Sequence, residues 1–296
     1  MQARFVLLGG SGLIGARTRA ECRNAGIDVV APVSRELDLR TPEGSDKLCD
    51  LLNDQTVLVV SVRARPNADV CRMALDDVAA AVNVGRALAS RRAQKCIFWS
   101  SLAVYGDRAS NLAITEATPL SPSSPYAIAK VAAERIIQEA ADQSRTPLLI
   151  LRACMIYGPG DETSSYGPSR LVREALLTGR ASLIGHGDDL RPYLFVGDAA
   201  AINLRLARSA HEGTLNLAPG QSHSCAEVLD LVREVSGATF DVIHEPRPRP
   251  RIDLRAVPIR LEAALLSLPL TDLKAGLAET CGAYRRQSQS HTINHG

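Results

Sequence analysis

Tyr126 and Lys130, in the stretch SPYAIAK, have the types and spacing needed for proton transfer. If the segment is a helix, residues four positions apart share one face, so the ammonium lies beside the phenol. A free tyrosine has a pKa of about 10 and is a slow acid or base at neutral pH. Because a neighbouring cation stabilises the phenolate, we expect Lys130 to lower the pKa of Tyr126.

A hydroxyl that holds a substrate carbonyl or alcohol is the partner that such a tyrosine needs. The stretch FWSSLAVYG supplies serines at the expected C-terminal end of a strand. Open α/β sheets bind their ligands at that end of their strands. The pattern therefore predicts a serine and tyrosine that act together on one oxygen atom of the substrate.

The N-terminal stretch LLGGSGLIGA has the glycine spacing of a dinucleotide-binding loop. Gly9, Gly12 and Gly15 fit GxxGxxG, and Gly10 fits the first position of GxGxxG. Such glycines let the backbone approach a pyrophosphate while the next helix points its amides at the negative charge. The residues expected to bind the cofactor here are Gly9, Gly12, Leu13, Ile14 and Gly15. The alternative is a strand-to-helix turn without a ligand.

The expected second strand, residues 28–33, ends where a dinucleotide-binding fold contacts the adenosine ribose. Ser34 and Arg35 follow it, and a hydroxyl and a guanidinium suit the 2′-phosphate of NADP. NADP is therefore the expected cofactor, and NAD is the alternative because the adjacent Glu36 is able to bind a ribose. Asp38 is expected either near the adenine edge or as a solvated loop carboxylate.

Short runs rich in Val, Ile and Leu alternate with longer segments of helical period, which indicates βαβ units around a parallel sheet. The expected strands are residues 4–9, 28–33, 56–62, 95–101 and 147–152. We expect an α/β fold with a Rossmann-type doubly wound sheet and a smaller C-terminal substrate-binding lobe. The predicted division is a core of residues 1–155 with 186–210, a lobe of 156–185 with 211–284, and a flexible tail of 285–296.

Composition argues against several classes of protein. The formal net charge is +2 with acidic residues interspersed among basic ones, so no nucleic-acid partner is expected. No apolar run approaches the roughly 18 residues of a membrane span, and the first glycines come too early for a signal peptide. Seven cysteines without a CxxC pair fit reduced thiols. A cytoplasmic protein is expected, without a metal site because the histidines are not grouped as ligands.

Six stretches occur in the order and spacing of one known family. They are the N-terminal glycine loop, NVGRAL around Asn83, SSLAVYG, SPYAIAK, LRACMIYGPG and RPYLFVGDAA. Over nearly its whole length the chain resembles an extended short-chain dehydrogenase/reductase of the NAD(P)-dependent epimerase/dehydratase family. The resemblance implies a Rossmann core, a C-terminal substrate lobe, a Ser/Tyr/Lys site and often a homodimer.

The resemblance also implies roles for single residues of the site. Ser101 matches the position that polarises the substrate carbonyl, and Tyr126 matches the acid or base. Lys130 matches the residue that tunes the tyrosine and holds the nicotinamide ribose.

Two arginines in the second half of the chain are candidates for substrate binding. Arg191 matches the arginine that binds the diphosphate in nucleotide-sugar members, and its alternative is a surface arginine paired with Asp188 or Asp189. Arg251 lies in PRPRPR, which either clamps a phosphate or is an extended solvated connector.

Departures from the family pattern bear on the reaction. Many dehydratases carry an acidic pair where this chain has Leu102 and Ala103, so an elimination step lacks its acid. Met155 replaces an asparagine that contacts the substrate phosphate in many nucleotide-sugar epimerases. Arg63 stands in the segment that usually reads His-Leu-Ala-Ala, where it either contacts the cofactor pyrophosphate or faces solvent.

These features together predict an NADPH-dependent ketoreductase whose substrate is, by resemblance, a nucleotide-linked 4-keto-6-deoxysugar. The alternative is a nucleotide-sugar 4-epimerase that keeps NAD bound and returns the hydride to the other face of the sugar. A hypothesis of another class, a redox-sensing binding protein, would not need the tyrosine, so the presence of all three site residues argues against it.

Overall fold

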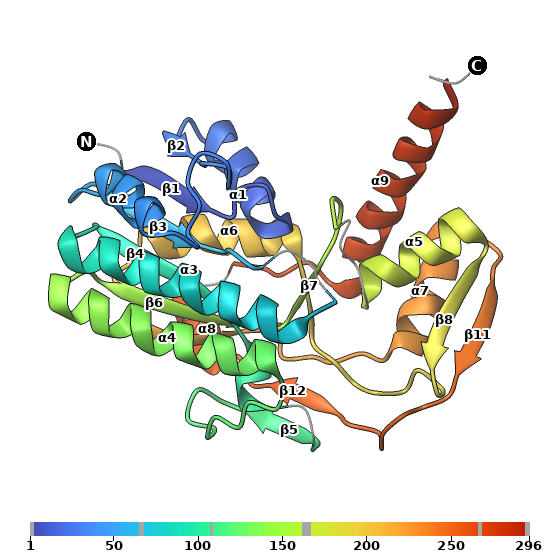
Figure 1. The fold of residues 1–296 in the computed structure, drawn as a ribbon. Helices are drawn as coiled ribbons and strands as arrows, with labels where there is room; N and C mark the ends of the chain where they lie inside the picture. Colours follow the sequence, from blue (N-terminus) through green and yellow to red (C-terminus); the bar gives the residue numbers. More distant parts are fainter. Residues whose placement is uncertain (1–2, 65–67, 107–108, 162–166, 266–267, 294–296) are drawn as a thin grey trace.

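A six-stranded parallel sheet forms the centre of the computed structural model, which describes residues 3–64, 68–106, 109–161, 167–265 and 268–293 (Figure 1). The strands are β1 (Arg4–Leu8), β2 (Val29–Val30), β3 (Thr56–Val60), β4 (Lys95–Ser101), β6 (Leu148–Ala153) and β10 (Gly213–Leu217). Their order is β10-β6-β4-β3-β1-β2, so the chain changes direction across the sheet between β1 and β3. Doubly wound sheets bind nucleotides at this kind of switch point. The predicted Rossmann-type fold is confirmed.

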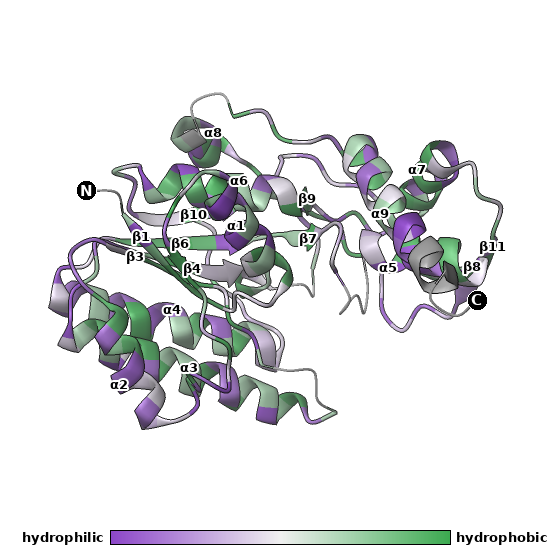
Figure 2. Cartoon of the chain, turned by 90° about the horizontal axis from the view of Figure 1, so that it is seen from above, coloured by the Kyte–Doolittle hydropathy of each residue, from purple (hydrophilic) through white to green (hydrophobic). Residues whose placement is uncertain are grey.

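Helices cover both faces of the sheet (Figure 2). One face carries α2 (Pro42–Leu51), α3 (Val70–Ser90) and α4 (Pro125–Ser144), and the other carries α1 (Leu13–Asn24), α6 (Val196–Ala207) and α8 (Ile259–Leu265). Successive side chains of a strand point to opposite faces. In β1, Phe5 and Leu7 therefore pack on the side of α1 and α6, while Val6 and Leu8 pack on the side of α2, α3 and α4.

The second half of the chain also forms a smaller lobe beside the core (Figure 1). It contains the parallel strands β8 (Arg180–Ile184) and β11 (Asp241–Glu245) and the helices α5 (Pro168–Thr178), α7 (Cys225–Ser236) and α9 (Leu273–Ile293). Tyr157, Tyr193 and Phe195 are buried in its apolar core. Two further short parallel pairs are β7 (Met155–Tyr157) with β9 (Tyr193–Phe195) and β5 (Asn111–Ile114) with β12 (Leu254–Ala256).

The observed division of the chain differs from the predicted one in several places. Residues 213–217 were expected in the lobe but form β10 at the edge of the central sheet, where α8 packs with them. Leu215 and Leu217 are buried there, but GTLNL contains only these two apolar side chains, whereas the predicted strand TVLVV contains four. Residues 285–293 were expected in a flexible tail but continue helix α9.

The seven cysteines are free thiols, and Cys22, Cys96, Cys154 and Cys281 are buried. Burial raises the pKa of Cys22 to about 11, so this thiol stays protonated at neutral pH. In the described part of the chain, none of the helices is both long enough and apolar enough to cross a membrane.

Candidate active site

The loop between β1 and α1 is shaped by close backbone contacts that require glycine. Gly9 has a φ of +84°, and a Cβ there would lie 2.7 Å from the Ser61 carbonyl oxygen. A Cβ on Gly15 would lie 2.2 Å from the Gly9 carbonyl oxygen. The backbone of the loop therefore packs directly against the backbone at the end of β3. It forms a cradle of the kind that holds a pyrophosphate.

Helix α1 begins at this cradle without a side-chain cap. Gly12 is the N-cap, and its amide donates to the Gly9 carbonyl oxygen at 2.9 Å. Leu13 and Ile14, both predicted to bind the cofactor, direct partly buried side chains toward the lobe core and the sheet core respectively. Only their backbone amides are therefore suited to an anion, which the helix dipole favours at this end.

The predicted adenosine-binding residues follow β2, which is only 2 residues long. Ser34, Arg35 and Glu36 are exposed in the turn after it. The Glu36 carboxylate accepts a backbone amide of this turn at 3.0 Å, so it is already engaged. Asp38 accepts from Arg40, with 2.7 Å between Oδ2 and Nη2. The structure therefore presents Arg35 at the surface and pairs Asp38 with a neighbouring guanidinium.

Ser101, Tyr126 and Lys130 come together at the C-terminal end of β4. Ser101 ends this strand and caps the short 3-10 helix η1 (Leu102–Tyr105). Tyr126 lies in the first turn of α4, which is fixed by the Ser124 hydroxyl as it accepts a backbone amide at 3.2 Å. Ser101 lies close enough to the Tyr126 hydroxyl to lower the pKa of the phenol. Lys130 lies one turn later, with Nζ 5.9 Å from the centroid of the Tyr126 ring.

The electrostatics of this cluster differ from the expectation for Lys130. Burial raises the pKa of Tyr126 above its ordinary value, and the cation that offsets this effect is Arg63. Burial also lowers the pKa of Lys130 to about 8. The Lys130 ammonium donates to the Trp99 carbonyl oxygen at 3.0 Å and lies 5.2 Å from the centroid of the Phe98 ring. The ammonium is therefore directed toward β4, while its nitrogen remains 5.9 Å from the centroid of the Tyr126 ring.

Arg63, predicted as a cofactor contact, lies over the tyrosine ring. Its guanidinium carbon is 4.9 Å from the centroid of the Tyr126 ring. Asp77, half-buried on α3, accepts the Ala64 amide at 2.6 Å. Its carboxylate is close enough to act electrostatically on both Arg63 and Lys130.

A buried chain of hydrogen bonds connects α4 to three strands of the sheet. Glu134 accepts from Arg152 Nε at 3.0 Å and from Nη2 at 2.7 Å, and it also accepts from the Ser100 hydroxyl. Arg152 Nη1 donates to the Tyr105 hydroxyl at 2.9 Å, which donates to Asn216 Oδ1 at 2.7 Å. These contacts hold α4 on β4, β6 and β10, and so they fix the position of Tyr126.

Asp77, Glu134 and Arg152 were not predicted from the sequence. A signal existed for Glu134, which follows Tyr126 and Lys130 at the same spacing of four residues and so shares their helix face. Arg152 stands in an otherwise apolar strand, which indicates a buried charge that needs a partner. Asp77 gave no such signal, because it lies in a helical segment beside another aspartate.

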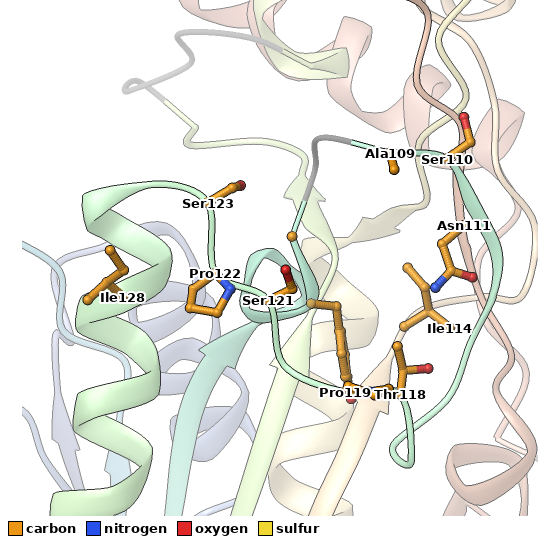
Figure 3. A pocket seen from close by; sticks show the side chains of 12 residues that line it. Ala109, Ser110, Asn111, Ile114, Thr118, Pro119, Ser121, Pro122, Ser123 and Ile128 are labelled. Atoms are coloured by element: carbon orange, nitrogen blue, oxygen red, sulfur yellow. The ribbon is translucent and has the colours of Figure 1, made fainter.

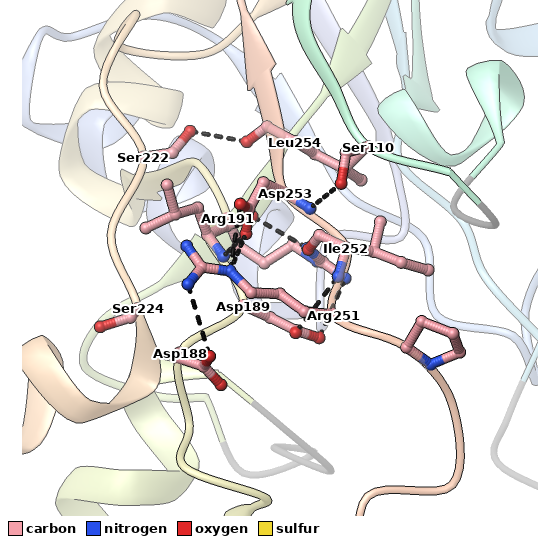
Figure 4. Close-up of polar contacts among 12 residues, drawn as sticks. Ser110, Asp188, Asp189, Arg191, Ser222, Ser224, Arg251, Ile252, Asp253 and Leu254 are labelled. Atoms are coloured by element: carbon pink, nitrogen blue, oxygen red, sulfur yellow. Dashed lines mark hydrogen bonds and ion pairs between the residues drawn. The ribbon is translucent and has the colours of Figure 1, made fainter.

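The two arginines predicted to bind the substrate lie in a cluster of ion pairs (Figure 4). Arg191 Nη1 donates to a backbone carbonyl at 2.9 Å, and its Nη2 lies 3.6 Å from Asp189 Oδ2. Arg251 Nε lies 3.0 Å from Asp253 Oδ1, and its Nη1 lies 3.4 Å from Asp188 Oδ2. The pairing of Arg191 with Asp189, one alternative in the sequence, is therefore present. A diphosphate would have to compete with these carboxylates.

The stretch 246–251 is held to the loop between β8 and β9 by the same acidic pair. Arg247 pairs with Asp188 and lies 3.2 Å from Asp189, and Arg249 lies 3.2 Å from Asp189. No helix or strand is formed between β11 and β12. PRPRPR is thus an extended connector that is fixed by its arginines.

A cavity of about 530 Å³ lies beside the segment that leads into α4 (Figure 3). Its described lining is uncharged and carries the hydroxyls of Thr118, Ser121 and Ser123 together with apolar groups such as Ile114. The volume is in the range of small-molecule sites.

Known proteins resemble this chain in sequence over much of its length. The model of the NAD dependent epimerase/dehydratase family matches residues 5–218. A GDP-6-deoxy-D-mannose reductase of Pseudomonas aeruginosa is 26% identical over 268 residues, which are 87% of this chain and 88% of that protein. An uncharacterized UDP-glucose epimerase of Bacillus subtilis is 27% identical over 146 residues, which are 49% of this chain and 45% of that protein. The chain thus spans less than half the length of the second relative.

Solved structures resemble the chain over nearly its full length. MoeE5 in complex with UDP-glucose and NAD has a TM-score of 0.84 and 24% identity, covering 97% of this chain and 100% of that one. RMD from Pseudomonas aeruginosa complexed with NADPH has a TM-score of 0.82 and 22% identity, covering 96% and 100%. At these identities the likeness shows the fold. The match to the family model covers most of the chain, and the chain therefore belongs to the NAD dependent epimerase/dehydratase family.

Proposed function

We propose that this protein is an NADPH-dependent ketoreductase whose substrate is a nucleotide-linked keto-sugar, specifically a 4-keto-6-deoxysugar. The observation that carries the proposal is the position of Ser101 beside Tyr126 at the C-terminal end of β4, where the serine lowers the pKa of the phenol. Two neighbouring hydroxyls suit a single carbonyl oxygen, because one holds it and the other gives it a proton. The similarity to a GDP-6-deoxy-D-mannose reductase over most of both chains supports reduction.

The residues at the dehydratase positions also favour reduction over elimination. Leu102 is buried in η1 and Ala103 follows it, so neither position offers a group that exchanges protons. An elimination requires an acid for the leaving hydroxide. A carbonyl reduction requires one proton donor, which Tyr126 provides.

In the proposed reaction, Ser101 Oγ donates to the substrate carbonyl oxygen, and the Tyr126 hydroxyl transfers its proton to the same oxygen. A bound nicotinamide supplies the hydride. The phenolate left on Tyr126 is stabilised by the Arg63 guanidinium. An ammonium has three N–H donors, so Lys130 has donors for the nicotinamide ribose besides the one it gives to Trp99.

We assign NADP to the cofactor site. Arg35 is exposed beyond β2 and offers a guanidinium to a 2′-phosphate, with Ser34 beside it. Glu36 accepts a backbone amide of the same turn, and this engagement makes it less available to ribose hydroxyls. The glycine cradle fits the pyrophosphate of either cofactor, because its missing side chains leave the backbone accessible.

We place the nucleotide of the substrate toward the lobe, near Arg191 and Arg251. Arg251 is the more accessible of the two, with 47% of its side chain exposed against 17% for Arg191. Both already contact carboxylates, so binding of a diphosphate exchanges one anionic partner for another. A homodimer and a cytoplasmic location stay predictions from the resemblance and the composition. Light scattering of the purified protein tests the homodimer.

The second candidate function is a nucleotide-sugar 4-epimerase that keeps NAD bound. It is favoured by the similarity to a UDP-glucose epimerase and by the shared fold with MoeE5, whose structure contains UDP-glucose and NAD. An epimerase uses the same tyrosine, first as a base and then as an acid.

Cofactor turnover separates the two functions. The purified protein is mixed with NADPH, or with NADH, and with a panel of nucleotide-linked 4-keto-6-deoxysugars and UDP-sugars, and absorbance at the nicotinamide band is followed against product. A ketoreductase consumes one NADPH for each product molecule. Conversion of a UDP-sugar to its 4-epimer with no net change in NADPH would refute the reductase and support the epimerase.

A further inference from the structure

Three elements bring a second cation and its counter-ion to the tyrosine. Arg63 follows β3, Tyr126 begins α4, and Asp77 lies on α3. The Arg63 guanidinium carbon stacks 4.9 Å from the centroid of the tyrosine ring. The Asp77 carboxylate accepts the amide of Ala64, the residue next to Arg63, at 2.6 Å. The backbone that carries the arginine is therefore anchored on the helix that packs against α4.

We propose that Arg63 is a positioning residue that orients the Tyr126 ring and stabilises its phenolate, and that Asp77 holds Arg63 in this place. The inference rests on the proposed role of Tyr126 as proton donor and assigns part of its control to two residues outside the Ser/Tyr/Lys set. A guanidinium over an aromatic face is favoured by the ring quadrupole, and its positive charge also favours the ionised phenol.

The geometry gives this part to Arg63 rather than to Lys130. The Lys130 ammonium is 5.9 Å from the centroid of the Tyr126 ring and donates to the Trp99 carbonyl oxygen. Arg63 is exposed and has no such competing carbonyl among its described contacts. A guanidinium group is also planar, which suits stacking on an aromatic face better than a compact ammonium does.

The charges around the phenol act in opposite directions. Arg63 favours the phenolate, and Asp77 disfavours it. Ser101 carries no charge and also favours the phenolate. Lys130 lies between Asp77 and Glu134, and both carboxylates favour its protonated form. A second aspartate, Asp76, adds to the negative potential at Asp77.

The test follows the ionisation of Tyr126 itself, so it needs neither substrate nor turnover. Protein labelled with 13C at tyrosine Cζ is titrated by NMR from neutral pH to pH about 12, and Tyr126→Phe identifies the signal. Arg63→Gln is expected to raise the titration midpoint by about one pH unit, because a charge near 5 Å is removed. Asp77→Asn is expected to lower it by a smaller amount, because it removes a carboxylate that disfavours the phenolate while the amide oxygen still accepts the Ala64 amide.

Two matched variants control for general effects. Arg233 also stacks on a ring, 4.6 Å from the centroid of Phe240, so Arg233→Gln removes an equivalent contact in the lobe. Asp76→Asn removes the neighbouring carboxylate, which pairs with Arg72 at 3.1 Å. Both are expected to move the Tyr126 midpoint by much less than the test variants do.

Opposite shifts in Arg63→Gln and Asp77→Asn, with small shifts in both controls, support the proposal. It is overturned if the midpoint is the same in wild type and both test variants, if Asp76→Asn acts like Asp77→Asn, or if Tyr126 titrates in none of them. The pH profile of keto-sugar reduction should follow the same shifts. Shifts without turnover of any nucleotide sugar would refute the proposed function alone, and turnover without shifts would refute this inference alone.

Discussion

Glu134→Gln is the substitution that most directly tests whether buried charge holds the site together. The glutamate is 4% exposed and its partner Arg152 is 8% exposed. The carboxylate accepts two hydrogen bonds from the guanidinium, at 3.0 Å and 2.7 Å, and one from Ser100. Glutamine has nearly the same shape but no charge, and its amide nitrogen cannot accept. The substitution therefore leaves the Arg152 cation buried without a counter-ion.

The expected loss of stability follows from this burial. Breaking a buried pair by removing one partner costs about 3 to 5 kcal/mol, because the remaining charge stays desolvated. For a chain of this size, 1 kcal/mol corresponds to about 2 °C in Tm. We therefore expect the Tm of Glu134→Gln to fall by roughly 6 to 10 °C. In the double variant Glu134→Leu/Arg152→Met no charge remains, so much of this loss should be recovered.

Thermal unfolding followed by circular dichroism measures these changes. The matched control is Asp230→Asn, which removes a carboxylate 3.1 Å from Arg233 in a pair whose side chains are 77% and 42% exposed. An exposed pair of this kind contributes about 1 kcal/mol or less, so the Tm should change little. A Tm for Glu134→Gln within about 2 °C of the wild type, or equal to that of the control, would refute the reasoning.

Three further predictions concern the site. Tyr126→Phe should lower kcat by roughly 10²- to 10⁴-fold while the Kd for the cofactor stays nearly unchanged, since the ring remains but the proton donor is lost; equal activity would exclude the assigned acid. Because the pKa of Lys130 is about 8 in the folded protein against an ordinary 10.5, the native state binds fewer protons than the unfolded state between these values. The free energy of unfolding should therefore rise with pH across this window, by about 3 kcal/mol more in the wild type than in Lys130→Met. Urea unfolding at both ends of the window measures this rise, and an equal pH dependence in the two proteins would contradict the prediction. Arg35→Ala should weaken NADPH binding by about tenfold with little effect on NADH, because only the 2′-phosphate contact is lost; calorimetry checks this, and equal losses for both cofactors would count against NADP.

The sequence predicted the parts of this molecule that depend on local pattern. Apolar runs such as TVLVV indicated buried parallel strands, and the spacing of Tyr126 and Lys130 placed both on one side of α4. The glycine loop was predictable because its shape requires glycine: a Cβ at Gly15 would collide with the Gly9 carbonyl oxygen, so the requirement appears in the sequence as a glycine pattern. Such features are set by neighbours in the chain, which a single sequence displays.

What the sequence did not reveal depends on contacts between distant segments. The direction of the Lys130 ammonium is decided by the Trp99 carbonyl, which lies 31 residues away. Arg63 reaches Tyr126 only because β3 and α4 meet in the fold, and no spacing rule connects them. The edge strand β10 was missed for a related reason, since its five residues are recognisable as a strand only beside β6.

The brevity of β2 has a consequence for how cofactor preference is able to change during evolution. The turn that carries Ser34, Arg35 and Glu36 begins beyond a two-residue strand at the margin of the sheet, and all three side chains are exposed. Substitutions there alter the charge offered to the adenosine moiety but remove no apolar contact from either layer of helices. Selection for one nicotinamide cofactor or the other can therefore act on this turn with almost no penalty in folding.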